Sequence, residues 1–270
     1  MTVLPDHSSV PSYGDMLSLE GRGFVVAGAG HGIGRQTAHA LAANGAKVVC
    51  VDVVGEFAEQ VADEVGGTPL VVDMCERSGV AAALATANAS FGNLAGIVDI
   101  IGISKFLFLA DTTDDDWDWH QRMNVRHAFL IAQLGGKELA RQGGGTLVYV
   151  ASISGISGAQ KQAAYGAAKA SVISLVKSAA VELGPEGVRV NAVAPGVVFT
   201  PRIGVTLGEE RSRAWAESTP LKRLGVPSDI ASTALFLSSD LSAFVNGQTV
   251  VVDGGAGQKF PYPLETLGVA

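Results

Sequence analysis

A glycine-rich turn between an apolar run and a helix-like segment constrains the fold of this chain more than any other feature. The turn follows the apolar run 24–27 and reads Gly28-Ala29-Gly30-His31-Gly32-Ile33-Gly34. Glycines adopt backbone dihedrals that other residues avoid, let a phosphate approach the backbone, and let a helix pack closely on a strand. The helix N-terminus that follows offers N–H groups and a partial positive charge to a pyrophosphate. The turn predicts a dinucleotide-binding unit whose candidate contacts are Gly28, Gly30, His31, Gly32, Ile33 and Gly34.

Apolar strand-like runs alternate with helix-like segments along most of the chain. After the first, strands are expected at 47–51, 69–72, 97–101, 146–150, 188–192 and 249–252. Helices are expected at 34–44, 56–65, 76–89, 163–183 and 227–238, with one long or two consecutive helices over 114–141. Such alternation indicates a parallel sheet covered on both faces. The pattern predicts a single doubly wound α/β domain of the Rossmann type, with about seven strands.

No linker or internal repeat interrupts this alternation. One domain is therefore expected over residues 20–255. Residues 1–19 are expected to form an N-terminal extension, and residues 256–270 a tail punctuated by Gly and Pro.

Composition disfavours several classes of function. The chain has 19 Lys and Arg against 26 Asp and Glu and no basic run, so nucleic acid is a poor partner. No stretch approaches the roughly 18–20 apolar residues of a membrane span, and the polar start does not resemble a signal peptide. The only cysteines are Cys50 and Cys75, so no disulfide framework is indicated and a cytoplasmic protein is expected.

An acidic residue ends the second expected strand, about twenty residues beyond the glycines. The carboxylate of Asp52 is placed to accept both hydroxyls of an adenosine ribose and to repel a 2′-phosphate. A solvated Asp at a strand end is the alternative interpretation. Arg35, directly after the last glycine, is within reach of a phosphate. On balance the sequence favours NAD over NADP as the cofactor.

Three residues carry the candidate chemistry. Tyr165 and Lys169 stand four apart in a strongly helical stretch, which puts them on one helix face. A nearby ammonium favours phenolate and lowers a tyrosine pKa from about 10, so that the phenol can exchange a proton with a substrate oxygen. Ser152 follows a strand end, where side chains face the crevice of an open sheet, and its hydroxyl can hold the same oxygen. Each residue alone has an ordinary structural explanation, but their combination with the glycine turn is far more specific.

In these motifs the chain resembles the short-chain dehydrogenase/reductase family over nearly its whole length, about 21–255. The matching positions are Gly28, Gly32, Gly34, Asp73, Asn124, Ser152, Tyr165, Lys169, Pro195, Gly196, Thr200, and the segments 246–248 and 253–255. The resemblance implies hydride transfer between a nicotinamide and a secondary alcohol or ketone, and no metal.

The resemblance also implies a role for each matching residue. Tyr165 would be the general acid or base, and Lys169 would lower its pKa and bind the nicotinamide ribose. Ser152 would polarise the substrate carbonyl, and Asn124 would hold a water that links the lysine to solvent. The implied cofactor contacts are Asp73 and Met74 near adenine, and Pro195, Gly196, Val198 and Thr200 near the carboxamide.

The stretch 197–222 corresponds to the family's substrate loop and lid helices. Apolar side chains there and near the expected site suit an apolar or alicyclic alcohol or ketone, although core packing explains them about as well. They are Phe199, Ile203, Val205, Leu207 and Trp215, with Ile103, Phe106, Phe108 and 153–156. The family commonly forms tetramers, so a homotetramer or dimer is expected, with the helices around 124–139 and 163–183 as candidate interfaces.

One strand end departs from the family. The Asn-Asn-Ala-Gly signature aligns with Asp99-Ile100-Ile101-Gly102, in which only the glycine is kept. Asp99 can accept backbone hydrogen bonds but cannot donate them, and an unpaired charge buried there is costly. This departure leaves open a catalytically silent dinucleotide-binding protein, such as a sensor or scaffold. A third hypothesis is an enzyme of dehydration or epimerisation, although such relatives usually have a longer C-terminal substrate region.

Overall fold

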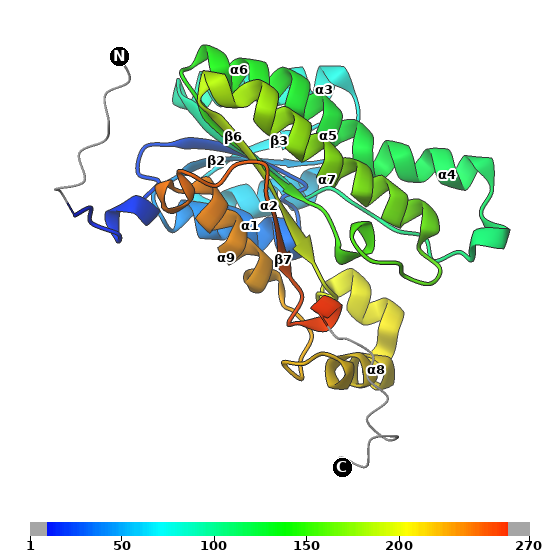
Figure 1. The fold of residues 1–270 in the computed structure, drawn as a ribbon. Helices are drawn as coiled ribbons and strands as arrows, with labels where there is room; N and C mark the ends of the chain where they lie inside the picture. The colour runs from blue at the N-terminus through cyan, green and yellow to red at the C-terminus, as the bar shows by residue number, and fades with distance from the viewer. Residues whose placement is uncertain (1–9, 259–270) are drawn as a thin grey trace.

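A seven-stranded parallel sheet forms the centre of the computed structural model, which describes residues 10–258 without the side chains of residues 202 and 205–207 (Figure 1). The strands are β1 Gly23–Ala27, β2 Lys47–Asp52, β3 Thr68–Val71, β4 Leu94–Asp99, β5 Gly145–Val150, β6 Val188–Pro195 and β7 Thr249–Val252. Their order is β3-β2-β1-β4-β5-β6-β7. The strands that follow β1 in the chain, β2 and β3, lie on one side of it, and β4 to β7 lie on the other. Open α/β sheets bind ligands where the strand order reverses in this way, so a crevice is expected at the carboxyl ends of β1 and β4.

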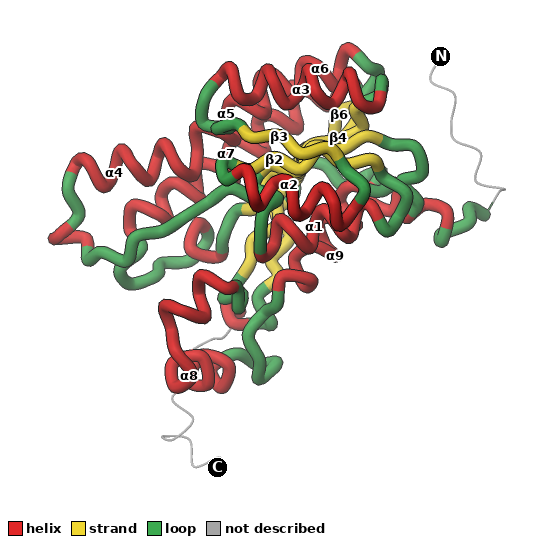
Figure 2. The backbone as a smooth tube through the Cα atoms, turned by 180° about the vertical axis from the view of Figure 1, so that it is seen from behind, coloured by secondary structure: helices red, strands yellow, loops and turns green. Residues whose placement is uncertain are grey.

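Helices cover both faces of the sheet, as Figures 1 and 2 show from opposite sides. On one face lie α1 Gly32–Ala42, α2 Gly55–Val65 and α9 Pro227–Ser238. On the other lie α3 Arg77–Phe91, α5 His127–Leu130, α6 Gly136–Arg141 and α7 Ala163–Leu183. These layers confirm the predicted doubly wound α/β fold.

The residues of β1 show why the strands read as continuous apolar runs. Successive side chains of a strand point to opposite faces of the sheet. Val25 and Ala27 belong to the core under α3, α5 and α7, and Phe24 and Val26 to the core under α1 and α9. Because both faces are covered, every position of the strand is buried and apolar.

The segment 114–141, expected as one long or two consecutive helices, forms one continuous helical run with two π-helical turns. It starts with α4 Asp114–Gln121, and the turns at Arg122–Arg126 and Ile131–Gly135 flank α5 and precede α6. A π-helical turn is an inserted bulge that often marks a functional site. The first of these turns contains Asn124.

The fourth strand is offset from its predicted range of 97–101. β4 covers Leu94–Asp99, so Ile100 and Ile101 lie beyond it. The side chain of Asp99 accepts a hydrogen bond from Ile101 N at 3.1 Å directly after the strand. Apolar composition alone did not reveal that the strand ends at Asp99.

The stretch 197–222 contains α8, Pro201–Ser218, which projects away from the layers (Figure 1). Thr200 caps it by accepting from Ile203 N at 3.3 Å, and Gly208 kinks it with φ 69° and ψ 173°. At the other end of the domain, Leu19 is fully buried, so the N-terminal extension reaches the core at its last residue. Residues 1–9 and 259–270 of the predicted extensions lie outside the described residues.

Candidate active site

Three predicted site residues lie together at the carboxyl ends of β4 and β5. Ser152 follows β5, and Tyr165 and Lys169 lie in the first two turns of α7. Lys169 Nζ donates to Val150 O at 2.7 Å and to Ile101 O at 3.2 Å, so it spans the ends of both strands. An ammonium has three donors, and these two bonds leave one N–H for a further acceptor.

The phenol of Tyr165 lies within reach of the hydroxyl of Ser152. Ser152 Oγ also accepts from Ser154 N at 3.1 Å, which fixes the hydroxyl oxygen at the start of the loop after β5. Burial raises the pKa of Tyr165, and the hydroxyl of Ser152 opposes that effect. A hydroxyl that donates to the phenol oxygen stabilises the phenolate.

Lys169 is buried next to this pair, with Nζ 5.9 Å from the centre of the Tyr165 ring. Burial lowers the pKa of the lysine to about 8, and the charge of Asp99 works in the opposite direction. The sequence led us to expect a tyrosine pKa lowered by the ammonium. In this structure burial outweighs any such effect and the pKa of Tyr165 is raised.

Asn124 joins the first π-helical turn to the segment after β4. Its Oδ1 accepts from Ile103 N at 3.0 Å, and its Nδ2 donates to Ile103 O at 2.9 Å and to His120 O at 3.0 Å. The amide is fully buried and both of its polar atoms are used. Asn124 therefore fixes the wall of the site opposite α7.

Gly102, which is all that remains of the family signature at this strand end, lies between two of these side chains. A Cβ on Gly102 would lie 2.6 Å from Lys169 Nζ and 3.2 Å from Asn124 Oδ1. Only a residue without a side chain leaves room for the lysine at its present position. Close packing at the site therefore explains why a glycine stands at this position.

Asp99 is buried but not unpaired, which corrects the concern raised by its place in the sequence. Its Oδ2 lies 2.7 Å from Nδ1 of His127 on α5, and both side chains are 2% exposed. Sequence reasoning missed His127. The sequence showed that an Asp buried at a strand end would require a hydrogen-bond donor. Nothing in it indicated that this donor lies on α5.

The glycine turn has the geometry of a phosphate cradle. Gly28 has φ +82°, and a Cβ on Gly34 would lie 1.8 Å from Gly28 O, so the turn and α1 are in direct contact. The N-terminus of α1 follows His31, with no side-chain cap and no acidic residue in its first turn. N–H groups without a side-chain cap suit an anion.

Asp52 closes this cradle at the end of β2. Its Oδ2 accepts from Gly30 N at 3.0 Å and its Oδ1 from Val54 N at 3.0 Å. Arg35, the cation that sequence reasoning placed within reach of a phosphate, is bound to Glu64 at 2.7 and 3.1 Å. This arrangement leaves a carboxylate facing the turn, with the nearby guanidinium already engaged.

The remaining predicted cofactor residues fall into two groups. After β3, Asp73 accepts from Cys75 N at 2.8 Å, whereas the side chain of Met74 is buried in the core, so only the backbone of Met74 is available to a ligand. After β6, the side chain of Thr200 packs 3.5 Å from the Cβ position of Gly32, next to the glycine turn. Pro195, Gly196 and Val198 lead from the end of β6 to this threonine.

Apolar side chains surround the open side of the site. The segment after β4 carries Phe106 and Phe108, and its Leu107 forms a bridge with Gln162 directly before α7. Under α8, a cavity of about 400 Å³ is lined by Ile153, Trp215 and other residues. The side chains of Val205 and Leu207 lie outside the described part of the chain.

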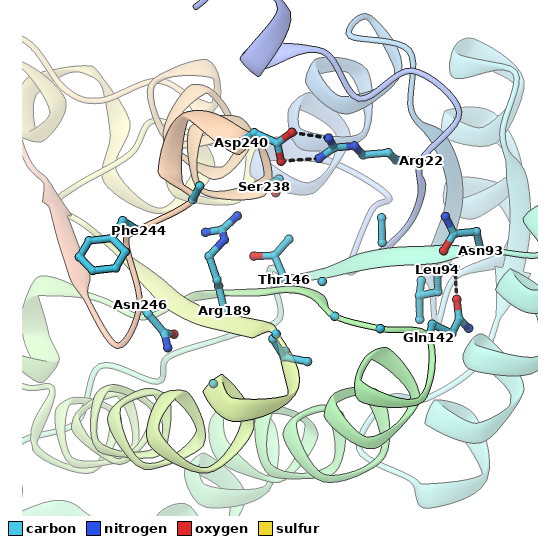
Figure 3. Close-up of a pocket in the computed structure, with 18 residues that line it drawn as sticks. Arg22, Asn93, Leu94, Gln142, Thr146, Arg189, Ser238, Asp240, Phe244 and Asn246 are labelled. Carbon is cyan, nitrogen blue, oxygen red and sulfur yellow. Dashed lines mark hydrogen bonds and ion pairs between the residues drawn. The ribbon is translucent and has the colours of Figure 1, made fainter. Parts of the chain in front are cut away.

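A larger cavity of about 730 Å³ lies at the amino ends of the strands, opposite the candidate site (Figure 3). It is lined by the first residues of strands, among them Leu94 and Val188, and is therefore remote from Tyr165. Its arginines are engaged. Arg22 pairs with Asp240 at 2.8 Å (Figure 3). Arg189 donates to the backbone carbonyls of Leu237 and Ser239. The larger cavity is not the site of the predicted chemistry.

Two classes of feature are absent from residues 10–258. No group of three or more His, Cys, Asp or Glu side chains within that range is arranged to hold a metal ion. No helix within it has both the length and the apolar character needed to cross a bilayer.

Comparison with known proteins identifies relatives that cover most of the chain. The family model described as "Enoyl-(Acyl carrier protein) reductase" matches residues 28–257. The chain is 36% identical over 244 residues to a probable galactose dehydrogenase of Rhizobium meliloti (strain 1021), covering 88% of this chain and 95% of that protein. It is 34% identical over 242 residues to the D-threitol dehydrogenase of Mycolicibacterium smegmatis, covering 88% and 93%.

A solved structure is similar in fold and sequence. It is a 7α-hydroxysteroid dehydrogenase complexed with NADH and 7-oxo glycochenodeoxycholic acid, with a TM-score of 0.86 and 31% sequence identity. The match covers 92% of this chain and 99% of that chain.

Proposed function

The chain belongs to the short-chain dehydrogenase/reductase family, and we propose that it is an NAD(H)-dependent oxidoreductase that interconverts a secondary alcohol and a ketone. The observation that carries the proposal is the contact between the Tyr165 phenol and the Ser152 hydroxyl, with the ammonium of Lys169 in the next helical turn. A protein that only binds a nucleotide has no need of a proton donor in this position. The partnered state of Asp99 removes the one observation that favoured a catalytically silent protein.

The residues around the glycine turn fit a dinucleotide. Gly34 lets α1 pack directly against Gly28 O, and the start of α1 has no side-chain cap, so its N–H groups remain for a phosphate. Asp52 is the acceptor for the adenosine ribose, and the third N–H of Lys169 is the donor for the nicotinamide ribose. When bound, the nicotinamide supplies or accepts the hydride.

The chain's own residues handle the proton. In the reducing direction, Ser152 donates a hydrogen bond to the carbonyl oxygen of the ketone. As the carbonyl carbon is reduced, the π electron pair moves to that oxygen, which takes the proton of Tyr165. The positive charge of Lys169 stabilises the resulting phenolate. In the oxidising direction the same phenolate removes the proton of the alcohol.

NAD is proposed in preference to NADP. The 2′-phosphate of NADP would meet the Asp52 carboxylate, and two like charges in contact repel. Arg35, which could compensate, is held by Glu64, whose pKa its hydrogen bonds lower to about 2. Because Glu64 stays ionised at neutral pH, the guanidinium remains engaged.

The proposed substrate is a small alcohol or ketone of apolar or alicyclic character. Exposed apolar side chains such as Phe106 and Phe199 support this choice. The relatives named above include a dehydrogenase with a bound oxo-steroid derivative, which is alicyclic, and dehydrogenases of galactose and D-threitol, which are polar. Alicyclic compounds and sugars or polyols differ in how much apolar surface they bury on binding.

We also propose that the protein is a cytoplasmic homotetramer or dimer. Phe129 on α5 is 43% exposed and Val181 on α7 is 77% exposed, and both belong to the helices expected at the interface. Light scattering of the purified protein measures the assembly directly.

The proposed activity is tested by following the absorbance of the reduced nicotinamide. The purified protein is mixed with NAD or NADH and with alicyclic, aliphatic and polyol alcohols or their ketones. We expect turnover with NAD(H), faster with the alicyclic compounds, and a much slower reaction with NADP(H). Absence of turnover with every compound, while NADH still binds, would favour the silent nucleotide-binding protein.

A further inference from the structure

We propose that His127 and Asp99 form a buried positioning pair for Lys169. In this pair His127 holds the Asp99 carboxylate, and the carboxylate keeps the lysine ammonium charged and in place. This inference rests on the proposed function, in which Lys169 acts as a cation. His127 touches neither substrate nor cofactor and acts through Asp99.

A continuous set of hydrogen bonds leads from the imidazole to the ammonium. His127 Nδ1 lies 2.7 Å from Asp99 Oδ2, and Asp99 Oδ1 accepts from Ile101 N at 3.1 Å. The carbonyl of the same Ile101 accepts from Lys169 Nζ at 3.2 Å. Asp99 thus fixes the residue whose carbonyl holds the ammonium. The two oxygens of one carboxylate connect α5 to the carboxyl end of β4.

The imidazole has one hydrogen-bond partner in the described residues. His127 Nε2 is buried and has none there, whereas Nδ1 faces the carboxylate. Placing the proton on Nδ1 satisfies Asp99 and leaves no buried N–H on the other nitrogen without an acceptor. In this tautomer the imidazole donates its one N–H to the carboxylate, and the charge of Asp99 acts on Lys169.

Titratable groups from several elements lie near this pair. Of the two nearby arginines, Arg122 is paired with Asp73 and Glu76. The other, Arg126, donates to Cys75 O.

Tyr149 on β5 lies opposite Asp99 in the sheet, and Cys75 follows β3. Burial raises the pKa of both groups, so both are neutral near pH 7. Tyr165 on α7 is likewise protonated there, because burial raises its pKa. Lys169 is thus the cation that faces the Asp99 carboxylate among these groups.

This arrangement opposes the effect of burial on the lysine. Burial lowers the pKa of Lys169 to about 8, and the charge of Asp99 is the factor that raises it. Without that charge the lysine would lose its proton at a lower pH. Without the imidazole N–H, the buried carboxylate loses a hydrogen-bond partner and is held less firmly in its present orientation. Loss of Asp99 and loss of the imidazole N–H should therefore both make Lys169 lose its proton at a lower pH.

The test follows the protonation of Lys169 directly, by NMR of protein labelled with ¹³C at the lysine ε-carbons. The signal is assigned by its loss in Lys169→Met. We expect Asp99→Asn and His127→Leu each to lower the titration midpoint by about one pH unit. Because the two residues act through one carboxylate, the double variant should shift no further than Asp99→Asn alone.

Two matched variants separate positioning from packing. His127→Asn places an N–H near the position of Nδ1 and should keep the midpoint of the wild type. Tyr149→Phe removes a buried hydroxyl whose bond goes to Ala128 O at 3.3 Å, and it should leave the midpoint unchanged. An unchanged midpoint in Asp99→Asn would overturn the proposal. So would additive shifts in the double variant, or a His127→Asn midpoint as low as that of His127→Leu.

This readout is independent of turnover. If the midpoints move as expected but no compound is turned over, the pair stands and the proposed function fails. If the wild type turns over a ketone and the midpoints do not move, the function stands and the pair is refuted. If His127→Leu does not fold, Asp99→Asn decides alone, since Asn keeps the size of Asp and an acceptor for Ile101 N.

Discussion

The Asp52 carboxylate accepts a hydrogen bond from the backbone N–H of Gly30 at 3.0 Å. A Cβ on Gly30 would lie 2.6 Å from that oxygen, so the strand end and the glycine turn are fitted to one another without space for a side chain. The residue proposed to choose between NAD and NADP therefore also holds the turn that is proposed to bind the pyrophosphate.

Replacing Asp52 by Ala should reduce the preference for NAD. The variant loses the acceptor for the adenosine ribose and the charge that repels a 2′-phosphate, so the ratio of kcat/KM for NAD to that for NADP should fall by about tenfold or more. Asp63→Ala, which removes an exposed carboxylate from α2, makes the same change in net charge and should leave the ratio unchanged. A wild type that prefers NADP would refute the role given to Asp52.

Replacing Gly102 by Ala should impair catalysis more than folding. The new Cβ would lie 2.6 Å from Lys169 Nζ, so the ammonium has to leave its position between Val150 O and Ile101 O. We expect kcat to fall by about 10²-fold. Gly158→Ala is the matched control, because no atom lies within 4 Å of its Cβ position. Equal activities of the two variants would show that the lysine is not held in this way.

Both cysteines should be unreactive in the folded protein. Burial raises the pKa of Cys50 and of Cys75 from 9.0 to about 12, so neither forms the reactive thiolate near pH 8. Because these pKa values are raised on folding, their contribution to stability is complete below pH 9 and is lost as the pH rises toward 12. Titration with a disulfide reagent near pH 8 should detect no fast thiol in the native state and two in denaturant. One fast thiol in the native protein would contradict the burial.

The parts of the structure that the sequence predicted well depend on local patterns. The helix bounds of α7 and α9 and the strand bounds of β7 are the predicted ones, because each has a clear apolar or helical period and a terminating residue. Tyr165 and Lys169 lie on the same helix face because their spacing fixes that geometry whatever the rest of the chain does.

The features that the sequence did not predict depend on contacts between distant segments. The pairing of Asp99 with His127 exists only because α5 packs over the end of β4. Asn124, in the first π-helical turn, bonds to Ile103, which lies 21 residues earlier in the chain. The raised pKa of Tyr165 follows from the burial of its phenol in the folded chain, which spacing along a helix does not reveal.

The account depends above all on Tyr165 as the proton donor. A single-turnover experiment with the enzyme saturated with NADH and mixed with the fastest ketone measures the hydride-transfer step, and NADH fluorescence measures binding separately. Tyr165→Phe should bind NADH as the wild type does and transfer hydride about 10²- to 10⁴-fold more slowly. Transfer at the wild-type rate in Tyr165→Phe would contradict the account.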